Sequence, residues 1–369
     1  MLISRIRNKV FFLIENYIFF FKNFFKRDLF FAKVFYQINI SLRKTDWIDL
    51  KSELAKIYKS GVLKNIEYKL FYNKNVVNLK DYYYPEIYLL YLYYRFFKNF
   101  SDTFNIKIIL LKNNFLKKKN FLFTKNFELQ NYDKNEIEVL FKNNLNKKLN
   151  SNQDKKFKIY LKGKKIALVG PKFSVKSLGD EIDTYDVVIR TNYRKNSNLP
   201  FSVYGSKTNI SYYNSYRVAN SKEDIIKNQT ELDWMIFKSQ NDIRKLDLDF
   251  SQIDTRVSIN PSNFFLFSSP MSPQRIIYDI LSYHPKVLKI FHFDFYNSGS
   301  YNKNYKHWDL SYKKISNNLR EHGAFSCFIF MKNFYEMNYF LADTETENVL
   351  KQDIKQYANN LDKNFGDLI

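Results

Sequence analysis

The sequence is poor in residues that cross-link a chain. Its 369 residues include one cysteine, Cys327, which excludes an internal disulfide and any zinc site built from several cysteines. No secretory signal with a small-residue cleavage site is recognisable. The apolar run from Val10 to Phe21 contains Glu15 and Asn16 and is too short to span a bilayer. These absences lead us to expect a reducing, cytoplasmic location.

Positive charge is abundant and unevenly placed. The chain has 59 Lys and Arg against 37 Asp and Glu, a net charge of +22. Residues 1–160 hold 31 basic and 14 acidic side chains, a net of +17, which leaves +5 for residues 161–369. A basic, aromatic half could bind nucleic acid or an anionic membrane surface. The heavy use of Phe, Tyr, Lys, Asn and Ile also fits the codon bias of an AT-rich genome, so the charge alone identifies no partner.

The N-terminal region reads as mainly helical. Residues 1–40 form a basic, aromatic stretch that suits a helix in a membrane interface or an amphipathic helix packed on its own protein. The stretch from Asp81 to Phe97 contains an apolar, tyrosine-rich run, Ile87 to Tyr94, which predicts a buried helix or strand. The polar stretch from Asn150 to Lys156 is a candidate linker. We therefore predict an N-terminal region, 1–155, and a second domain, 156–369.

The second domain shows a different pattern, in which short apolar runs alternate with helical stretches. The pattern predicts an α/β fold with a Rossmann-like, doubly wound, mostly parallel sheet. Such sheets bind ligands outside the carboxyl ends of their strands. The expected strands are 165–169, 185–190, 209–213, 234–237 and 287–293, and the expected helices are 273–283 and 309–320.

Several polar residues follow these strands. Gly170 opens a tight turn that either feeds a phosphate-binding helix or is an ordinary strand-to-helix turn, and it is part of neither a GxGxxG motif nor a P-loop. Asn192 could offer a donor and an acceptor to a nucleotide, or be a turn residue. His292 lies inside a strand and is expected to be a core histidine. His307 and His322 lie near predicted loops or helix ends, where catalytic groups concentrate.

Residues 166–192, IALVGPKFSVKSLGDEIDTYDVVIRTN, resemble the large sialyl motif of the sialyltransferases of glycosyltransferase family 29. That motif runs from a strand and a Gly-rich turn through Glu-Ile-Asp to a second strand and Arg-x-Asn. The counterparts here are 181–183 and 190–192, and residues 204–208, YGSKT, are similar to the Gly-Ser-Lys/Arg-Thr that follows in the family.

Three further blocks occur in the family's order. Residues 267–296 resemble the small motif, His307-Trp308-Asp309 resembles the short third motif, and His322 occupies the place of the histidine of the very short motif. Residues 294–301 also resemble a tract of the bacterial sialyltransferases of family 42. The resemblance covers roughly residues 164–340 and leaves 1–155 unexplained.

The resemblance implies an inverting transfer, without a metal or other cofactor, of sialic acid from a CMP-activated donor to a cell-surface glycan such as capsule or lipooligosaccharide. The leaving group is an anionic phosphate, so fixed donors aimed at it lower the barrier. The acceptor hydroxyl must lose a proton, which a histidine can take. By resemblance, His322 is the general base and His307 donates to the phosphate. The nucleotide and phosphate contacts would come from Gly170, Asn192, Asn214, Ser268, Ser269, Tyr296 and Tyr301.

The sequence departs from the family at several positions. Pro171 stands where the family has Asn after the first-strand Gly, and Ser269-Pro270 replaces Ser/Thr-Gly. No acidic residue follows His322 at the expected spacing, and there is no cysteine pair. These departures leave the donor open, because a related ulosonic acid such as Kdo has the same CMP leaving group.

Two other functions remain open at this point. One is a transferase that uses a UDP or GDP sugar. The other is a nucleic-acid-binding protein, against which stand the small surplus of +5 in residues 161–369 and the lack of a recognisable RNA or DNA module. We therefore expect no nucleic-acid partner. The basic N-terminal half would instead keep the enzyme peripheral on the inner face of the cell membrane, near lipid-linked glycan acceptors.

Overall fold

A computed structural model describes residues 133–194, 198–249, 251–261, 264–265, 269–298 and 312–365, and before them 54–55, 58, 84–99, 101–103 and 106. The chain divides into two compact units, Met1–Lys118 and Lys119–Ile369. Each unit is described by itself below.

In the first unit the tyrosine-rich run forms helix α5 (Tyr84–Phe97). Leu90 and Leu92 are fully buried, and the ring of Tyr93 stacks on Tyr58 with centroids 3.9 Å apart. Of the two predicted alternatives, helix and strand, the helix is therefore correct. The basic helix expected within residues 1–40 lies outside the described residues. None of the helices that are described combines the length and the apolar character needed to cross a bilayer.

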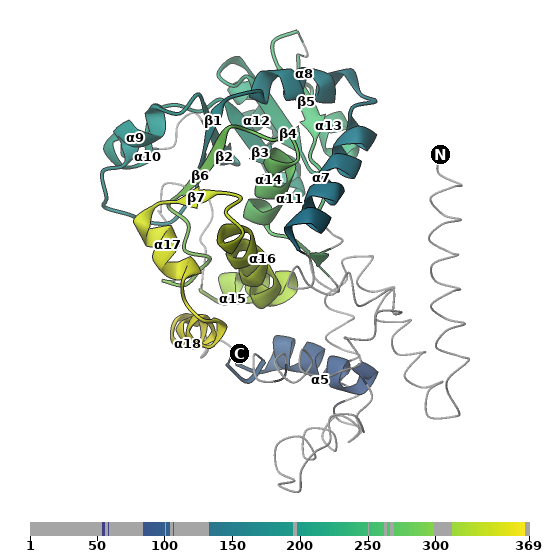
Figure 1. Ribbon diagram of the computed structural model, residues 1–369, viewed down its shortest axis with the longest axis vertical. Helices are drawn as coiled ribbons and strands as arrows, with labels where there is room; N and C mark the ends of the chain where they lie inside the picture. Colours follow the sequence, from purple (N-terminus) through teal and green to yellow (C-terminus); the bar gives the residue numbers. More distant parts are fainter. Residues whose placement is uncertain are drawn as a thin grey trace, which may run out of the picture. The chain divides into compact units, whose positions relative to one another are not determined.

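The second unit is built on a seven-stranded, all-parallel sheet with helices around it (Figure 1). The predicted α/β, Rossmann-like fold is therefore confirmed. Two strands that the sequence reading missed, β5 and β7, complete the sheet, whose spatial order is β5-β4-β3-β2-β1-β6-β7. The strands are β1 (Lys165–Val169), β2 (Val187–Thr191), β3 (Ile210–Tyr213), β4 (Trp234–Phe237), β5 (Asp254–Val257), β6 (Val287–Phe291) and β7 (Leu341–Ala342).

Both faces of the sheet are covered because the central strands are apolar on both sides. On one face, Met235 and Phe237 of β4 belong to a core cluster with Ile243 of α13. On the other face, the ring of Trp234 lies 4.9 Å from that of Phe157 in α8. The helices of this unit are α7 (Lys134–Lys148), α8 (Asn152–Leu161), α9 (Gly179–Asp183), α10 (Phe201–Tyr204), α11 (Ser215–Asn220), α12 (Lys222–Lys227), α13 (Gln240–Arg244), α14 (Ser272–Leu281), α15 (Tyr312–His322), α16 (Ala324–Glu336), α17 (Thr344–Leu350) and α18 (Ile354–Phe365).

The predicted linker from Asn150 to Lys156 is wrong, because most of it belongs to α8. The domain boundary predicted at residue 155 falls inside that helix, and the compact unit that holds the sheet begins at Lys119. The sequence analysis did not predict helix α7, because Asn and Lys make up much of its sequence. It begins at a capping box of Asp133 and Glu136, and its three buried apolar residues are spaced four apart so that they share one face. Those residues are Ile137, Phe141 and Leu145.

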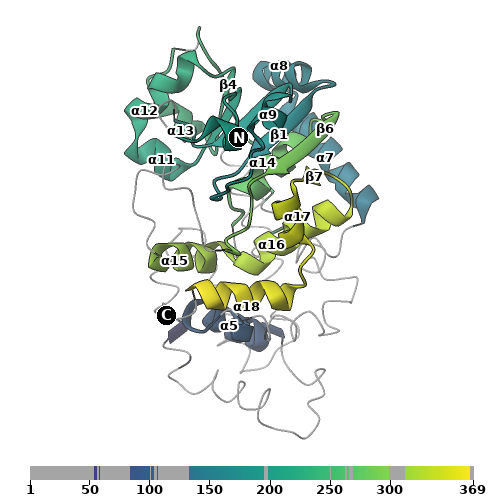
Figure 2. The ribbon, with the colours of Figure 1, turned by 90° about the vertical axis from the view of Figure 1, so that its left-hand side faces the viewer.

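The strand order reverses between β1 and β6, which places a topological switch point there. Strands β2 to β5 follow one another away from β1 on one side, and β6 and β7 lie on the other. Figures 1 and 2 both show α15, α16 and α18 gathered beyond one end of the strands. Residues of these helices line the same cavity as the strand ends, so they cover the carboxyl edge of the sheet.

Candidate functional site at the carboxyl edge of the sheet

A cavity of about 400 Å³ lies at the carboxyl edge of the sheet. Residues that follow six different strands line it, together with residues of α14, α15, α16 and α18. This is the position at which doubly wound sheets bind their ligands. The strand-end residues in its wall are Pro171, Lys172, Asn192, Asn214, Lys238, Ser258 and 292–296.

Gly170 directly follows β1 at the switch point, where β1 ends beside β6. Its N–H donates to the Phe291 carbonyl at 2.7 Å. A Cβ at this position would come within 2.4 Å of the His292 carbonyl oxygen and 2.9 Å of the Phe293 ring. Gly170 is not among the cavity-lining residues. The structure therefore gives this glycine a packing role, which differs from the predicted nucleotide contact.

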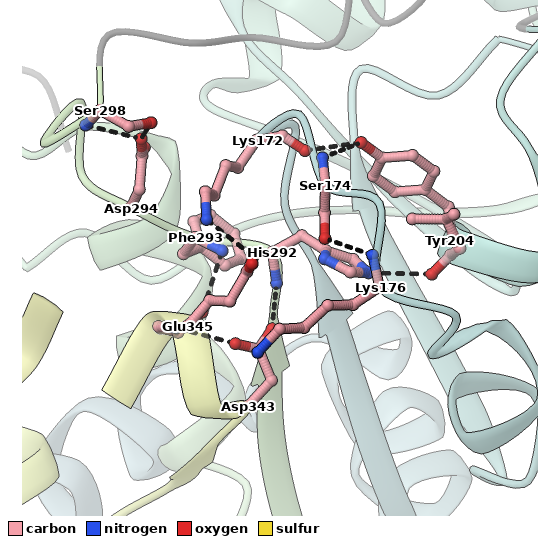
Figure 3. A network of polar contacts seen from close by, with 12 residues as sticks. Lys172, Ser174, Lys176, Tyr204, His292, Phe293, Asp294, Ser298, Asp343 and Glu345 are labelled. Atoms are coloured by element: carbon pink, nitrogen blue, oxygen red, sulfur yellow. Dashed lines mark hydrogen bonds and ion pairs between the residues drawn. The ribbon is translucent and has the colours of Figure 1, made fainter. Parts of the chain in front are cut away.

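A polar network fixes the loops that leave β1 and β6 (Figure 3). Asp343, the N-cap of α17, accepts from the backbone N–H of Thr346 at 2.7 Å and from that of His292 at 2.5 Å. The hydroxyl of Tyr204 donates to the Lys172 carbonyl at 2.6 Å, and the Lys172 N–H donates to the His292 carbonyl. These bonds satisfy backbone groups that the strand ends would otherwise leave unpaired.

His292 is a core histidine, as predicted. It is fully buried, and its Nε2–H donates to the Val203 carbonyl at 2.9 Å. Burial lowers its pKa, so the ring is neutral near neutral pH. The nearby Lys172 ammonium lines the cavity and forms an ion pair with Glu345 at 2.7 Å (Figure 3). Burial opposes ionisation of Glu345, but its hydrogen bond to Lys172 and the charge of Lys172 outweigh burial, so the pKa of Glu345 is lowered.

Two asparagines follow β2 and β3 and face the cavity. Asn192 has a positive φ of 53°, a conformation that asparagine tolerates better than most residues. Its side-chain oxygen accepts from the Asn214 N–H at 3.1 Å. The Asn214 side-chain oxygen in turn caps α11 by accepting from the Arg217 N–H at 2.7 Å. Neither side-chain NH₂ group bonds to any residue that the structure describes, so these groups are the donors that remain for a ligand.

His322, at the end of α15, is partly buried and lines the same cavity. Its Nδ1 lies 2.9 Å from the Ser269 hydroxyl and 3.0 Å from the Ser269 carbonyl oxygen. A carbonyl oxygen only accepts, so this contact favours the tautomer with the proton on Nδ1 and the lone pair on Nε2. Ser269 therefore orients the imidazole. It is not among the cavity-lining residues, whereas the prediction placed it in contact with the ribose or the donor carboxylate.

Tyr296 lies in the loop after β6 and lines the cavity with a positive φ of 68°. Its N–H donates to Asp294 Oδ1 at 2.9 Å, and the Ser298 hydroxyl and N–H donate to the other carboxylate oxygen. Burial raises the pKa of Asp294 despite these bonds. Asp294 thus shapes the loop that presents Tyr296.

The structure brings together four of the predicted site residues in the cavity wall: Asn192, Asn214, Tyr296 and His322. Ser268, Tyr301 and His307 lie outside the described residues, so their predicted roles stay predictions. In the part of the chain that is described, no group of three or more His, Cys, Asp or Glu side chains could hold a metal ion.

Sequence reasoning missed three cations in the cavity wall, Lys172, Lys238 and Arg275. Lys172 and Lys238 follow β1 and β4 closely, so the rule that ligands meet the residues after each strand could have found both. Arg275 lies in the first turns of α14 and carries no comparable signal. Among the described residues of the wall Asp294 is the one carboxylate, so this part of the lining carries a net positive charge.

No protein-family model matches the chain, and a search of curated proteins finds no match either.

Proposed function

We propose that the Lys119–Ile369 unit transfers a sugar, sialic acid or a related ulosonic acid, from a CMP-activated donor to a glycan acceptor. One observation carries the proposal. Asn192, Asn214, Tyr296 and His322 come from four separate segments and line one cavity at the carboxyl edge of a doubly wound sheet. The first two would contact the nucleotide and the last two would flank the reacting bond.

The residues supply the chemistry that such a transfer needs. The bond between the anomeric carbon and the phosphate oxygen breaks, and a bond from the acceptor oxygen to that carbon forms. The acceptor proton would pass to Nε2 of His322, whose other nitrogen is oriented by Ser269. The departing phosphate is an anion, and positively charged side chains in the cavity wall favour it.

Thermal unfolding in the presence of nucleotides tests the nucleotide part of the proposal. CMP should raise the unfolding temperature by mass action, by an amount that grows with its concentration, and UMP, UDP and GDP should do so less. Stronger stabilisation by UDP or GDP would indicate a transferase that uses another donor. No stabilisation by any of the four would remove the nucleotide proposal.

Turnover of CMP-N-acetylneuraminic acid tests the catalytic part. His322→Gln should lower kcat by about 10²–10⁴-fold, the usual contribution of a general base. Ser269→Ala should have a smaller effect, because the carbonyl contact to Nδ1 persists. His284→Gln is the matched control, since His284 is exposed and is not among the cavity-lining residues. If His322→Gln and His284→Gln retain equal turnover, His322 is not the base.

A further inference from the structure

Two cations lie in the cavity wall away from the switch point. Lys238 directly follows β4, and Arg275 lies in α14. In the sheet, β4 is separated from β1 by β3 and β2, so its carboxyl end lies roughly 14 Å from that of β1 at ~4.8 Å per strand. This part of the cavity is therefore distinct from the part where Lys172 and Tyr296 lie.

Arg275 is largely buried, and its guanidinium has no partner among the described residues. The residue is 9 % exposed, and it forms no hydrogen bond or ion pair with any residue that the structure describes. A buried guanidinium has five N–H donors, and leaving them unpaired costs free energy. Because Arg275 lines the cavity, the cavity is where those donors can find an acceptor.

The nearby carboxylates are already used by other groups. Asp279 accepts two hydrogen bonds from Arg256, at 2.6 and 3.0 Å. Asp242 accepts from the hydroxyls of Ser215 and Ser239 at 2.9 and 2.8 Å. Their charges act on Arg275 only through space and do not offset its burial, which lowers the pKa of Arg275 to about 10. Desolvation and the charge of Arg275 likewise lower the pKa of Lys238, although much of the Lys238 side chain is exposed.

A neighbouring hydroxyl adds a third group to this end of the cavity. Ser258, which follows β5, is 4 % exposed and belongs to the cavity wall, and its Oγ has no hydrogen-bond partner within the described chain. Two close cations repel each other, and an oxyanion between them would remove the repulsion and accept their hydrogen bonds.

We propose that Lys238, Arg275 and Ser258 form a subsite for an oxyanion, a carboxylate or phosphate, carried by the ligand of this cavity. The subsite itself is independent of the proposed function. Its assignment to the donor or to the acceptor sugar rests on that function. The cation pair thus selects for a ligand with an acidic group in this part of the cavity.

The direct test uses inorganic phosphate and no nucleotide. Phosphate at constant ionic strength should stabilise the full chain against thermal unfolding, and the concentration dependence gives an apparent Kd. Arg275→Gln and Lys238→Gln should each weaken this Kd by roughly tenfold, the effect of removing one charge-assisted hydrogen bond. The matched controls are Arg244→Gln and Lys245→Gln, which remove the same charges from exposed positions outside the cavity wall.

Folding of the variants is checked by their unfolding temperature without phosphate. The unpartnered Arg275 charge opposes folding, so Arg275→Gln should unfold at the same or a higher temperature than the unsubstituted chain. Lys238 is exposed, and its replacement keeps the proposal testable if Arg275→Gln does not fold. Equal phosphate affinity in the unsubstituted chain and in Lys238→Gln and Arg275→Gln, or no phosphate binding at all, would overturn the subsite.

Three further titrations identify the source of the oxyanion. If both variants weaken the binding of CMP-N-acetylneuraminic acid and leave the binding of CMP unchanged, the oxyanion is the donor carboxylate. If they weaken the binding of 3′-sialyllactose and leave the binding of lactose unchanged, the oxyanion belongs to an acidic acceptor. If CMP competes with phosphate and both variants weaken the binding of CMP, the oxyanion is the nucleotide phosphate. Failure of CMP to bind at all would refute the proposed function and leave the phosphate result standing.

Discussion

A substitution at Asp279 tests the hydrogen-bond network that joins α14 to the edge of the sheet beside the cavity. This side chain of α14 is fully buried and accepts four hydrogen bonds. Arg256 Nη1 and Nη2 donate at 2.6 and 3.0 Å, the Tyr212 hydroxyl at 2.6 Å and the Ile259 N–H at 2.7 Å. These donors come from β5, from β3 and from the segment after β5. One carboxylate therefore ties α14 to three parts of the sheet edge.

Replacing Asp279 by Asn removes the charge and leaves Arg256 with one carboxylate partner, Asp154, at 2.8 Å. Arg256 is 3 % exposed and loses one of its two carboxylate partners, and breaking a buried ion pair by removing one partner costs ~3–5 kcal/mol. The free energy of unfolding should fall by about that amount. With a urea m-value of ~1–3 kcal/mol/M, the unfolding midpoint should fall by roughly 1–5 M.

Urea unfolding followed by circular dichroism measures the change. Asp180→Asn is the matched control, since Asp180 is exposed, and it should stay within ~0.5 kcal/mol of the unsubstituted chain. Arg256→Met combined with Asp279→Asn should cost clearly less than the sum of the single changes, because the two side chains share one interaction. A cost below 1 kcal/mol for Asp279→Asn, or additive effects in the double variant, would refute this account of the network.

Two other predictions concern the switch point. Gly170→Ala should lower the unfolding temperature by several degrees in differential scanning calorimetry, because the added Cβ would meet the backbone of His292 at 2.4 Å. The affinity of the folded protein for CMP should not change. An unchanged unfolding temperature would contradict the close approach. The pKa of Glu345 is lowered by Lys172, so its contribution to stability is present above pH 4.5 and lost as the pH falls through its folded pKa. Lys172→Gln should therefore reduce the loss of stability below pH 4.5 in acid unfolding, and an identical pH profile would argue against the ion pair.

Most of the sheet could be predicted from its apolar runs. The strands at 165–169 and 234–237 have the predicted bounds, and the others begin or end within two residues of prediction. Strand β5 was missed because its sequence, Asp-Thr-Arg-Val, is polar, and Arg256 is buried there only through its ion pairs. Strand β7 has two residues, too few for any periodicity.

The site could be predicted only in part. Residues just after strands, such as Asn192 and Asn214, follow from the geometry of a parallel sheet. The contact between Ser269 and His322 joins positions 53 residues apart, and no local pattern encodes it. The packing role of Gly170 depends on the approach of β6, which lies more than a hundred residues later in the chain. Local sequence fixes which groups are available, and tertiary packing decides which of them meet.

The burial of Asp154 in α8 has a practical consequence for anyone who shortens this protein. A fragment that starts at residue 156 would lack α7 and the first turn of α8, and with them the carboxylate that accepts from Arg256 and from the Tyr283 hydroxyl. Such a fragment would retain the seven strands of the described sheet and still expose the rings of Tyr278, Phe334 and Tyr339, on which Phe141 of α7 packs. The shortest soluble piece should therefore begin ahead of Asp133, where the cap of α7 is intact.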